Sequence, residues 1–335
     1  MDLSTSYLGL ALANPLLASA SPLSHTVEGV RRLARGGVGA VVLHSLFEEE
    51  LDEEAERHAR LVEAGTESFA ESLSYFPEVL GGDHGATHYL SLLERAAAAV
   101  EIPVIASLNG VTPGGWTSYA RQMQEAGAAA VELNLYSSAT ALGMPGRDIE
   151  ARHVDTLGQV KAAVTIPVAV KISPYYTSVG EMAVRLRDAG ADGLVIFNRF
   201  FHPDVDPGAI ALVASLGLSH PSEGRLPRSW IALLRQHLAI DLAGSSGVEG
   251  PEDVVRYLLA GADVVMTASA LLRHGPGHAR VLVEGLAAWM ASKGFESLDQ
   301  LRGLLAISGD DAAARERSGY VAALRTANAT TQGPW

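Results

Sequence analysis

Two glycine- and serine-rich turns have the clearest chemical potential in this chain. Gly244-Ser245-Ser246-Gly247 follows one apolar run, and Thr267-Ala268-Ser269 follows the next one. Turns with so few side chains leave backbone N–H groups exposed at the ends of strands, and such groups bind phosphate when helix N-termini lie beside them. Pro251, Glu252 and Asp253 begin a helix directly after the first turn. The two turns therefore predict a phosphate site.

Lys171 is the second feature, because it closes the apolar run 167–172. A lysine buried there needs an anionic partner. Its functional interpretations are a Schiff-base amine or a fixed cation beside developing negative charge. The structural alternative is a side chain that reaches solvent at the rim. Asn134 and Asn198 end two other apolar runs, and beside Lys171 they would form a site.

Taken together, the run ends are polar but carry few charges, with amides, hydroxyls, one lysine, one arginine and one histidine. They lack the paired carboxylates of a glycosidase and a cluster of metal ligands. His84 and His88 have i, i+4 spacing but no third ligand nearby, so we expect no metal site. This set suits a large organic ligand held by neutral hydrogen bonds, with a phosphate at one end.

These residues are positioned by alternating strands and helices. The apolar runs are nearly continuous, which is typical of parallel strands buried on both faces. We predict strands at 15–20, 39–43, 103–107, 129–135, 167–172, 192–197, 239–243 and 263–267, with helices between most of them at 26–35, 89–99, 114–126, 178–189 and 251–259. Eight such units predict an α/β fold, a closed (β/α)8 TIM barrel that spans 1–335 as one domain. The alternative, an open doubly wound sheet, would place a GxGxxG turn after an early strand, and none is present.

Two connections are too long to be simple loops. They are 44–88 after the second strand and 199–227 after the sixth, and we expect these extended loops to cover the site. Helices near 276–293 and 311–325 close the chain, and the tip of the tail is expected to be disordered. The acidic run 48–56 is expected to be solvated.

Composition limits the partners and the compartment. The formal net charge is −13, which argues against nucleic acid and anionic membranes as partners. There is no cysteine, which excludes a thiol base and iron–sulfur ligation within this chain. The apolar stretch from Tyr7 to Ala20 lacks a basic leader, so it is predicted to be a first strand rather than a signal peptide. No apolar run is long enough to span a membrane, and we expect a cytoplasmic protein.

From residues 7–21 to 293–303, the chain resembles the dihydroorotate dehydrogenases, particularly the soluble class. The resemblance rests on several spaced motifs, including YLGLALANPLLASAS, ELNL, ALLRHGP and KGFESLDQLRG. It implies an FMN enzyme on a (β/α)8 barrel that acts on a small-molecule substrate as a homodimer.

The resemblance assigns most of the strand-end residues to the flavin. Residues Ser19, Ala20 and Ser21 would line it, Ser45 and Asn109 would approach its ring system, and Asn134 would bond near flavin or substrate. Lys171 would lie at the flavin N1–O2 edge, where its charge would stabilise the reduced ring, and Asn198 would point to the substrate side. The phosphate would lie in the cradle of Gly244, Ser246, Gly247, Ala268 and Ser269.

The substrate positions depart from the family pattern. The family's catalytic loop reads asparagine, two residues, cysteine or serine, then Pro-Asn, whereas here Ser137 stands at the base position and Pro-Asn is missing. His44 stands where the family has a lysine, and Arg199 replaces a small residue beside Asn198. The asparagine-rich loop that reads orotate has no match, and 72–77 stands in its place. The flavin residues thus persist while the substrate residues differ, as in the dihydroorotate dehydrogenase-like subgroup.

Four hypotheses follow. The preferred one is an FMN-dependent oxidoreductase with an altered pocket, in which hydride passes between a substrate C–H and flavin N5; Ser137 accepts the proton, with Tyr136 and His44 as alternatives. The others are a true dihydroorotate dehydrogenase of pyrimidine biosynthesis that uses Ser137 as base, a catalytically inactive FMN-binding protein, and a flavin-free phosphate-binding lyase or isomerase. Because the chain has no cysteine, electrons must leave the flavin directly or through an electron-acceptor protein.

Overall fold

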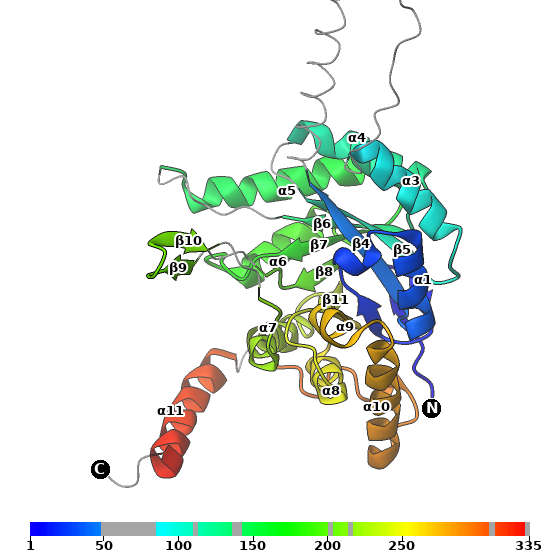
Figure 1. The fold of residues 1–335 in the computed structure, drawn as a ribbon. Coiled ribbons are helices and arrows are strands. Elements are labelled where there is room, and N and C mark those ends of the chain that lie inside the picture. The colour runs from blue at the N-terminus through cyan, green and yellow to red at the C-terminus, as the bar shows by residue number, and fades with distance from the viewer. Residues whose placement is uncertain are drawn as a thin grey trace, which may run out of the picture.

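A closed barrel of eight parallel strands forms the body of the protein (Figure 1). The computed structural model describes residues 1–47, 85–109, 113–135, 143–199, 204–213, 217–307 and 312–331. Around the barrel the strands are β3 (Leu16–Ala18), β4 (Ala40–Phe47), β5 (Val104–Asn109), β6 (Ala130–Asn134), β7 (Val168–Ile172), β8 (Gly193–Ile196), β11 (Asp241–Gly244) and β12 (Val264–Thr267), and β12 pairs with β3 to close it. The predicted (β/α)8 barrel and its eight strands are confirmed.

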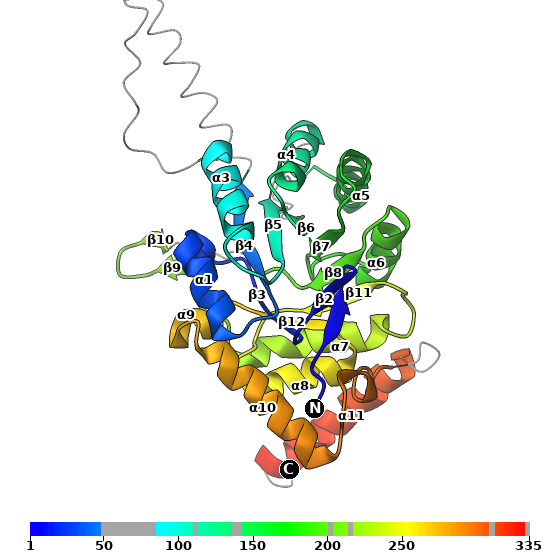
Figure 2. The ribbon, with the colours of Figure 1, turned by 90° about the vertical axis from the view of Figure 1, so that its right-hand side faces the viewer.

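Helices surround the barrel, as Figure 2 shows. They are α1 (Val27–Gly36), α3 (Ala86–Ala97), α4 (Pro113–Glu125), α5 (Gly146–Ala163), α6 (Val179–Asp188), α7 (Arg225–Leu234), α8 (Pro251–Ala260), the short α9 (Ser269–His274) and α10 (His278–Lys293). The five predicted inter-strand helices and the one near 276–293 are confirmed. The structure adds α5, whose buried face includes His153 and Thr156 and therefore shows a weak hydrophobic pattern. It also adds α7, which begins inside the stretch predicted as a long loop.

The apolar N-terminal stretch is not one strand, and that expectation is wrong. Strands β1 (Thr5–Tyr7) and β2 (Leu10–Leu12) form an antiparallel hairpin ahead of β3. Its two-residue turn, Leu8-Gly9, has φ values of 55° and 72°, which is the left-handed geometry that tight hairpins require. Leu8 packs against β8 so closely that a Cβ on Gly193 would lie 2.7 Å from Leu8 Cδ2. The hairpin therefore plugs the amino-terminal end of the barrel.

The barrel interior is apolar near this plug and polar at the other end. Side chains of Leu17, Val42, Ile105, Val195 and Met266 pack with the hairpin in one buried cluster. Toward the carboxyl ends of the strands, the buried side chains become polar: Ser19, Ser107, Asn109, Glu132, Asn134 and Lys171. Because every second residue of a strand faces the interior, strands such as β3, β5, β6 and β7 contribute first an apolar and then a polar residue to it. Function in such barrels lies at the polar end.

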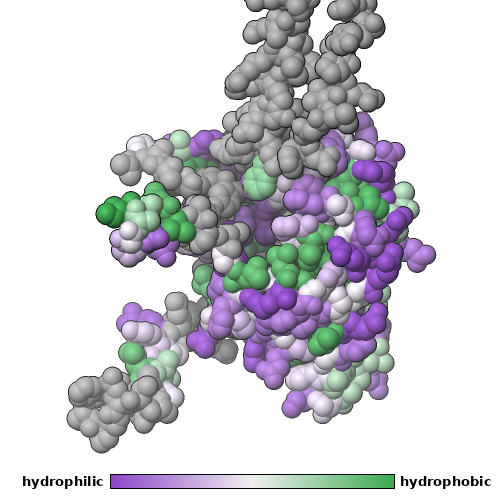
Figure 3. Space-filling view, in the orientation of Figure 1, coloured by the Kyte–Doolittle hydropathy of each residue, from purple (hydrophilic) through white to green (hydrophobic). Residues whose placement is uncertain are grey.

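Two elements stand off the barrel. The hairpin of β9 (Asp204–Asp206) and β10 (Ala211–Val213) exposes Val205, Ile210 and Leu212. Helix α11 (Ala312–Thr331) exposes Tyr320 and Val321, and both elements carry hydrophobic surface in Figure 3. Among the described helices, none combines the length and apolarity that a membrane span needs.

Several predictions fall outside the described residues. They concern most of the loop predicted at 44–88, with its acidic run and His84, and the tip of the tail. The described part of the stretch 199–227 contains the β9–β10 hairpin and the start of α7.

Candidate functional site

A cavity of about 230 Å3 opens at the carboxyl ends of β3, β7, β8, β11 and β12. Its lining includes nine residues predicted from the sequence: Ser19, Ala20, Ser21, Lys171, Asn198, Arg199, Ser246, Ala268 and Ser269. These residues come from distant parts of the chain and meet only because the barrel closes. The structure thus brings the two bare turns, the first strand end and the lysine to one cavity.

Lys171 is buried, with 7% of its surface exposed, and it is paired. Its ammonium donates to Glu132 Oε1 at 3.3 Å and to Ser19 Oγ at 3.4 Å. Strands β6 and β7 are neighbours, and Asn134 aligns with Lys171, so Glu132, two residues earlier, shares the inward face. Glu132 is 1% exposed, and its Oε2 has no hydrogen-bond partner within the described residues. The alternative of a lysine that reaches solvent at the rim is therefore wrong.

Sequence reasoning missed Glu132 as the counter-ion. It lies two positions before Asn134, so the two-residue periodicity of the strand contained the signal. Assigning the pair also required the register between β6 and β7, which is a property of the sheet.

Asn134 is part of a second buried group on the adjoining strands. Its Nδ2 donates to Ser45 Oγ and to Ser107 Oγ, both at 3.0 Å, and the two hydroxyls lie 2.8 Å apart. Asn134 Oδ1 has no partner within the described part of the chain. Asn109 is buried one strand away, aligned with Asn134. Ser107 was not predicted, although it is inward-facing at the end of β5.

Tyr89 fixes the position of this group from outside the barrel. Its hydroxyl accepts from Ser107 N–H at 2.8 Å and lies 3.2 Å from Ser107 O, to which it donates. Burial raises the pKa of Tyr89 above its ordinary value, so the hydroxyl stays protonated and able to donate. Tyr89 thus holds the backbone of Ser107 from the helix side, while Ser45 and Asn134 bond its hydroxyl inside the barrel.

The first turn predicted to bind phosphate, 244–247, is shaped by two left-handed residues, Ser246 (φ 79°) and Gly247 (φ 65°). Gly247 N–H donates to Ser219 Oγ at 3.3 Å, and Ser219 N–H donates to Ser269 Oγ at 2.9 Å. Ser219 therefore links the two predicted turns and lines the cavity with them. It lies in the long connection after β8, and nothing in its local sequence distinguishes it.

Gly244 and Gly247 are needed for close packing and do not line the cavity themselves. A Cβ on Gly244 would lie 2.2 Å from Tyr257 Cδ1, and one on Gly247 would lie 2.5 Å from the backbone nitrogen of Gly224. Their absent side chains let α8 and the segment before α7 approach the turn. They act on the cavity by shaping the turn that lines it.

Two of the predicted substrate residues have other contacts. Arg199, at the cavity rim, donates to Glu223 Oε2 at 2.9 Å and to Gly217 O at 2.6 Å. His44 packs against His25 in a tilted arrangement, with ring centroids 4.0 Å apart, and meets Tyr89 edge to face. His44 is not among the residues that line the cavity. The predicted base Ser137, with Tyr136, lies outside the described residues.

The donor set fits a phosphorylated organic ligand. One end of the cavity has backbone turns and hydroxyls for a phosphate, and the other has an ammonium. Glu132 Oε2 and Asn134 Oδ1 are buried polar atoms that lack protein partners in the described residues. Such atoms in a native protein call for a ligand or ordered water. Nowhere in the described ranges do three or more His, Asp or Glu side chains gather as a metal site.

The barrel and its cavity define an α/β-barrel protein whose cavity has turns of small residues at one end and a buried ammonium at the other. The family model of dihydroorotate dehydrogenase matches residues 2–290. The chain therefore belongs to the dihydroorotate dehydrogenase family, whose members are flavin-dependent oxidoreductases.

Three relatives illustrate the relationship. The catalytic subunit of dihydroorotate dehydrogenase B (NAD(+)) from Methanothermobacter thermautotrophicus is 27% identical over 322 residues, which cover 90% of this chain and 98% of the relative. A putative dihydroorotate dehydrogenase A (fumarate) from Aeropyrum pernix is 32% identical over 276 residues, which cover 74% of this chain and 88% of the relative. The NAD-dependent dihydropyrimidine dehydrogenase subunit PreA of Escherichia coli (strain K12) is 25% identical over 319 residues, which cover 90% of this chain and 76% of the relative.

Proposed function

We propose that the protein binds FMN in this cavity and transfers hydride between a small organic substrate and the flavin. One observation carries the proposal: two bare turns and the buried Lys171 line the same cavity. Bound FMN would supply the hydride chemistry at its N5 atom, while the protein supplies binding, orientation and charge. The phosphate would be held by Ser246, Ala268 and Ser269, and the ring would lie toward Lys171 and Asn134.

Lys171 would supply fixed positive charge at the ring end of the cavity. Glu132 and Ser19 hold its ammonium in place, so the charge needs no rearrangement when negative charge develops on a ligand. Asn134, whose amide nitrogen is held by two serines, would accept a hydrogen bond through Oδ1. These residues would orient the ligand and stabilise its charged form.

The substrate differs from dihydroorotate in this proposal. Asn134 and Asn198 remain at the predicted substrate positions, but Pro-Asn after Ser137 is missing from the sequence. A site built to bond a polar ring loses selectivity when one partner is removed. Arg199 donates to Glu223 and to Gly217 O, so in this proposal it fixes the segment 217–223 at the rim of the cavity and does not bind the substrate.

We also propose an electron-acceptor protein as partner. Two of the relatives are named as subunits, and this chain has no cysteine to hold an iron–sulfur relay. A homodimer, which the family resemblance implies, is part of the same proposal. Analytical ultracentrifugation of the purified chain tests the dimer, and co-purification from its own organism tests the partner.

The visible absorption spectrum tests the cofactor. The purified protein is expected to be yellow, and the flavin released by heat should co-elute with FMN in chromatography. A colourless protein that binds no added FMN would refute the proposal and favour the flavin-free lyase or isomerase. Anaerobic reduction by dihydroorotate tests the substrate, because rapid bleaching of the flavin by that compound would show a true dihydroorotate dehydrogenase.

Lys171→Ala tests the proposed role of the ammonium. The variant should slow flavin reduction much more than it weakens FMN binding, since the charge acts on the reduced state. Equal effects on the reduction rate and on the dissociation constant would remove Lys171 from the chemistry and leave it a binding residue.

A further inference from the structure

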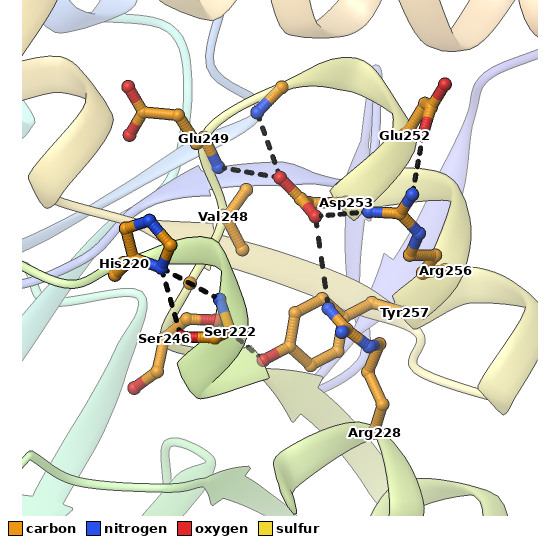
Figure 4. Close-up of polar contacts among 12 residues, drawn as sticks. His220, Ser222, Arg228, Ser246, Val248, Glu249, Glu252, Asp253, Arg256 and Tyr257 are labelled. Carbon is orange, nitrogen blue, oxygen red and sulfur yellow. Dashed lines mark hydrogen bonds and ion pairs between the residues drawn. The ribbon is translucent and has the colours of Figure 1, made fainter. Parts of the chain in front are cut away.

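Tyr257 of α8 lies behind the first phosphate turn and contacts it directly. The side chain is fully buried, with 0% exposed, and the missing side chain of Gly244 lets its ring pack against the end of β11. Its hydroxyl donates to Ser245 O at 2.6 Å and to Ser246 O at 2.7 Å, sharing one proton between two carbonyls. The contact to Ser246 is drawn in Figure 4.

These contacts determine which way the turn presents its N–H groups. In a trans peptide the C=O and the following N–H point in opposite directions. The carbonyl of Ser245 faces Tyr257, so Ser246 N–H faces away from α8, and Ser246 lines the cavity. The carbonyl of Ser246 also faces Tyr257, and Gly247 N–H on the opposite side reaches Ser219 Oγ.

A second residue of α8 holds the segment that connects this turn to the helix. Asp253 lies one helical turn before Tyr257, so both side chains project from one face of the helix. Asp253 Oδ2 accepts from Glu249 N–H at 3.2 Å and from Gly250 N–H at 3.1 Å. Figure 4 shows Asp253 bonded to the backbone of Glu249 and Tyr257 pointing toward Ser246.

Arg228 of α7 braces the pair. Its guanidinium carbon lies 5.5 Å from the centre of the Tyr257 ring, and its NH1 lies 4.0 Å from Asp253 Oδ1. A cation over the ring face holds an aromatic side chain in place. Burial raises the pKa of Tyr257 above its ordinary value, which keeps the hydroxyl protonated as a donor.

We infer that Tyr257 is a positioning residue for a phosphate monoester, because its hydroxyl holds the carbonyls of Ser245 and Ser246 away from the cavity and so leaves Ser246 N–H facing it. This inference rests on the proposed FMN function and deepens it. Without the hydroxyl, either peptide could rotate and present a carbonyl oxygen to the phosphate. The partial negative charge of the carbonyl oxygen would then face the phosphate, and neither acceptor would have a donor.

Binding of FMN and of riboflavin, which lacks the phosphate, tests the inference in full-length protein freed of flavin. Tyr257→Phe keeps the ring that packs on Gly244 and removes only the hydroxyl. We expect the dissociation constant for FMN to rise about tenfold, equivalent to about 1.4 kcal/mol. The constant for riboflavin should change less than about twofold, since a ligand without the phosphate makes no use of the turn.

Tyr7→Phe is the matched control. Tyr7 is another fully buried tyrosine, but its hydroxyl has no partner in the described residues and lies at the plugged end of the barrel. The control should change neither dissociation constant. Thermal unfolding of both variants defines a temperature at which all three proteins are folded, and binding is measured there.

The outcomes separate this inference from the proposed function. Equal weakening of FMN and riboflavin by Tyr257→Phe would make Tyr257 a structural residue only and overturn the inference, as would an unchanged FMN constant. If the unmodified protein binds riboflavin as tightly as FMN, or binds neither, the phosphate site itself is wrong and both proposals fail.

Discussion

The buried pair of Lys171 and Glu132 gives the sharpest quantitative prediction. Glu132→Gln keeps the shape of the side chain and an oxygen that can accept from Lys171, but it removes the negative charge. The two charged atoms lie 3.3 Å apart. At an effective dielectric constant of about 20, their attraction is about 5 kcal/mol. Removing one partner of a buried pair typically costs about 3–5 kcal/mol, because the other charge stays buried without compensation.

We therefore expect Glu132→Gln to destabilise the protein by about 3 kcal/mol. At about 2 °C per kcal/mol the melting temperature should fall by roughly 6 °C. Urea and thermal unfolding of the protein without flavin measure the change, so that ligand binding does not contribute. Glu28→Gln is the control, because Glu28 and Arg35 lie 3.4 Å apart, nearly the separation of the buried pair, but both side chains are exposed. An exposed pair contributes about 0.2–1 kcal/mol.

A double-mutant cycle completes the test. Lys171→Met leaves Glu132 as the uncompensated charge and should cost a similar amount, whereas the combined variant contains neither charge. The cost of the combined variant should be smaller than the sum of the two single costs by at least about 2 kcal/mol. Additive costs, or a Glu132→Gln cost as small as that of Glu28→Gln, would refute the assignment of a buried ion pair.

Three further predictions follow from the same structure. Burial, with a smaller contribution from Arg152, lowers the pKa of His153 from its ordinary 6.5 to about 4. As the pH falls, the unfolded chain binds this proton before the folded protein does. The stabilising contribution of His153 is therefore complete above about pH 6.5 and is lost, by up to about 3 kcal/mol, as the pH drops toward 4. A plot of melting temperature against pH over this range should be flatter for His153→Gln than for the unmodified protein, and equal slopes would contradict the assignment. Gly244→Ala should cost about 2 kcal/mol or more, because its Cβ would lie 2.2 Å from Tyr257, whereas Gly250→Ala, with nothing within 4 Å, should be near neutral in the same denaturation assay. FMN at about 100 times its dissociation constant should stabilise the folded protein by about 2.7 kcal/mol, and a melting temperature independent of FMN would count against the cavity as its site.

The strand count and the barrel could be predicted because they depend on local composition. Near-continuous apolar runs such as 167–172 indicate strands buried on both faces, and their regular alternation with helices admits few arrangements. The N-terminal hairpin was missed for the same reason. An apolar stretch of several short strands has the composition of one long strand, although the left-handed turn at Leu8-Gly9 separates β1 from β2 and residues 13–15 separate β2 from β3.

The candidate site could be predicted only in part. Residues that end strands, such as Lys171 and Asn198, follow from the rule that barrel sites lie at carboxyl ends. Ser219 could not be found, because it enters the cavity from a long connection whose path no local pattern specifies. His44 was placed on the substrate side because it stands where the family has a lysine, but its ring contacts His25 and Tyr89. A register shift in β4 between Val42 and Ser45 changes the alternation at that point.

The sequence by itself determined the fold class, the family and the two turns without large side chains, since each depends on residue types at short spacing. Only the tertiary structure decided that Glu132 neutralises Lys171, that Arg199 pairs with Glu223, and that Tyr257 lies behind the turn 244–247. These contacts depend on the register between neighbouring strands and on the packing of a helix against a strand end. Both are set by the closure of the whole barrel, where a shift of one residue would turn each inward side chain outward.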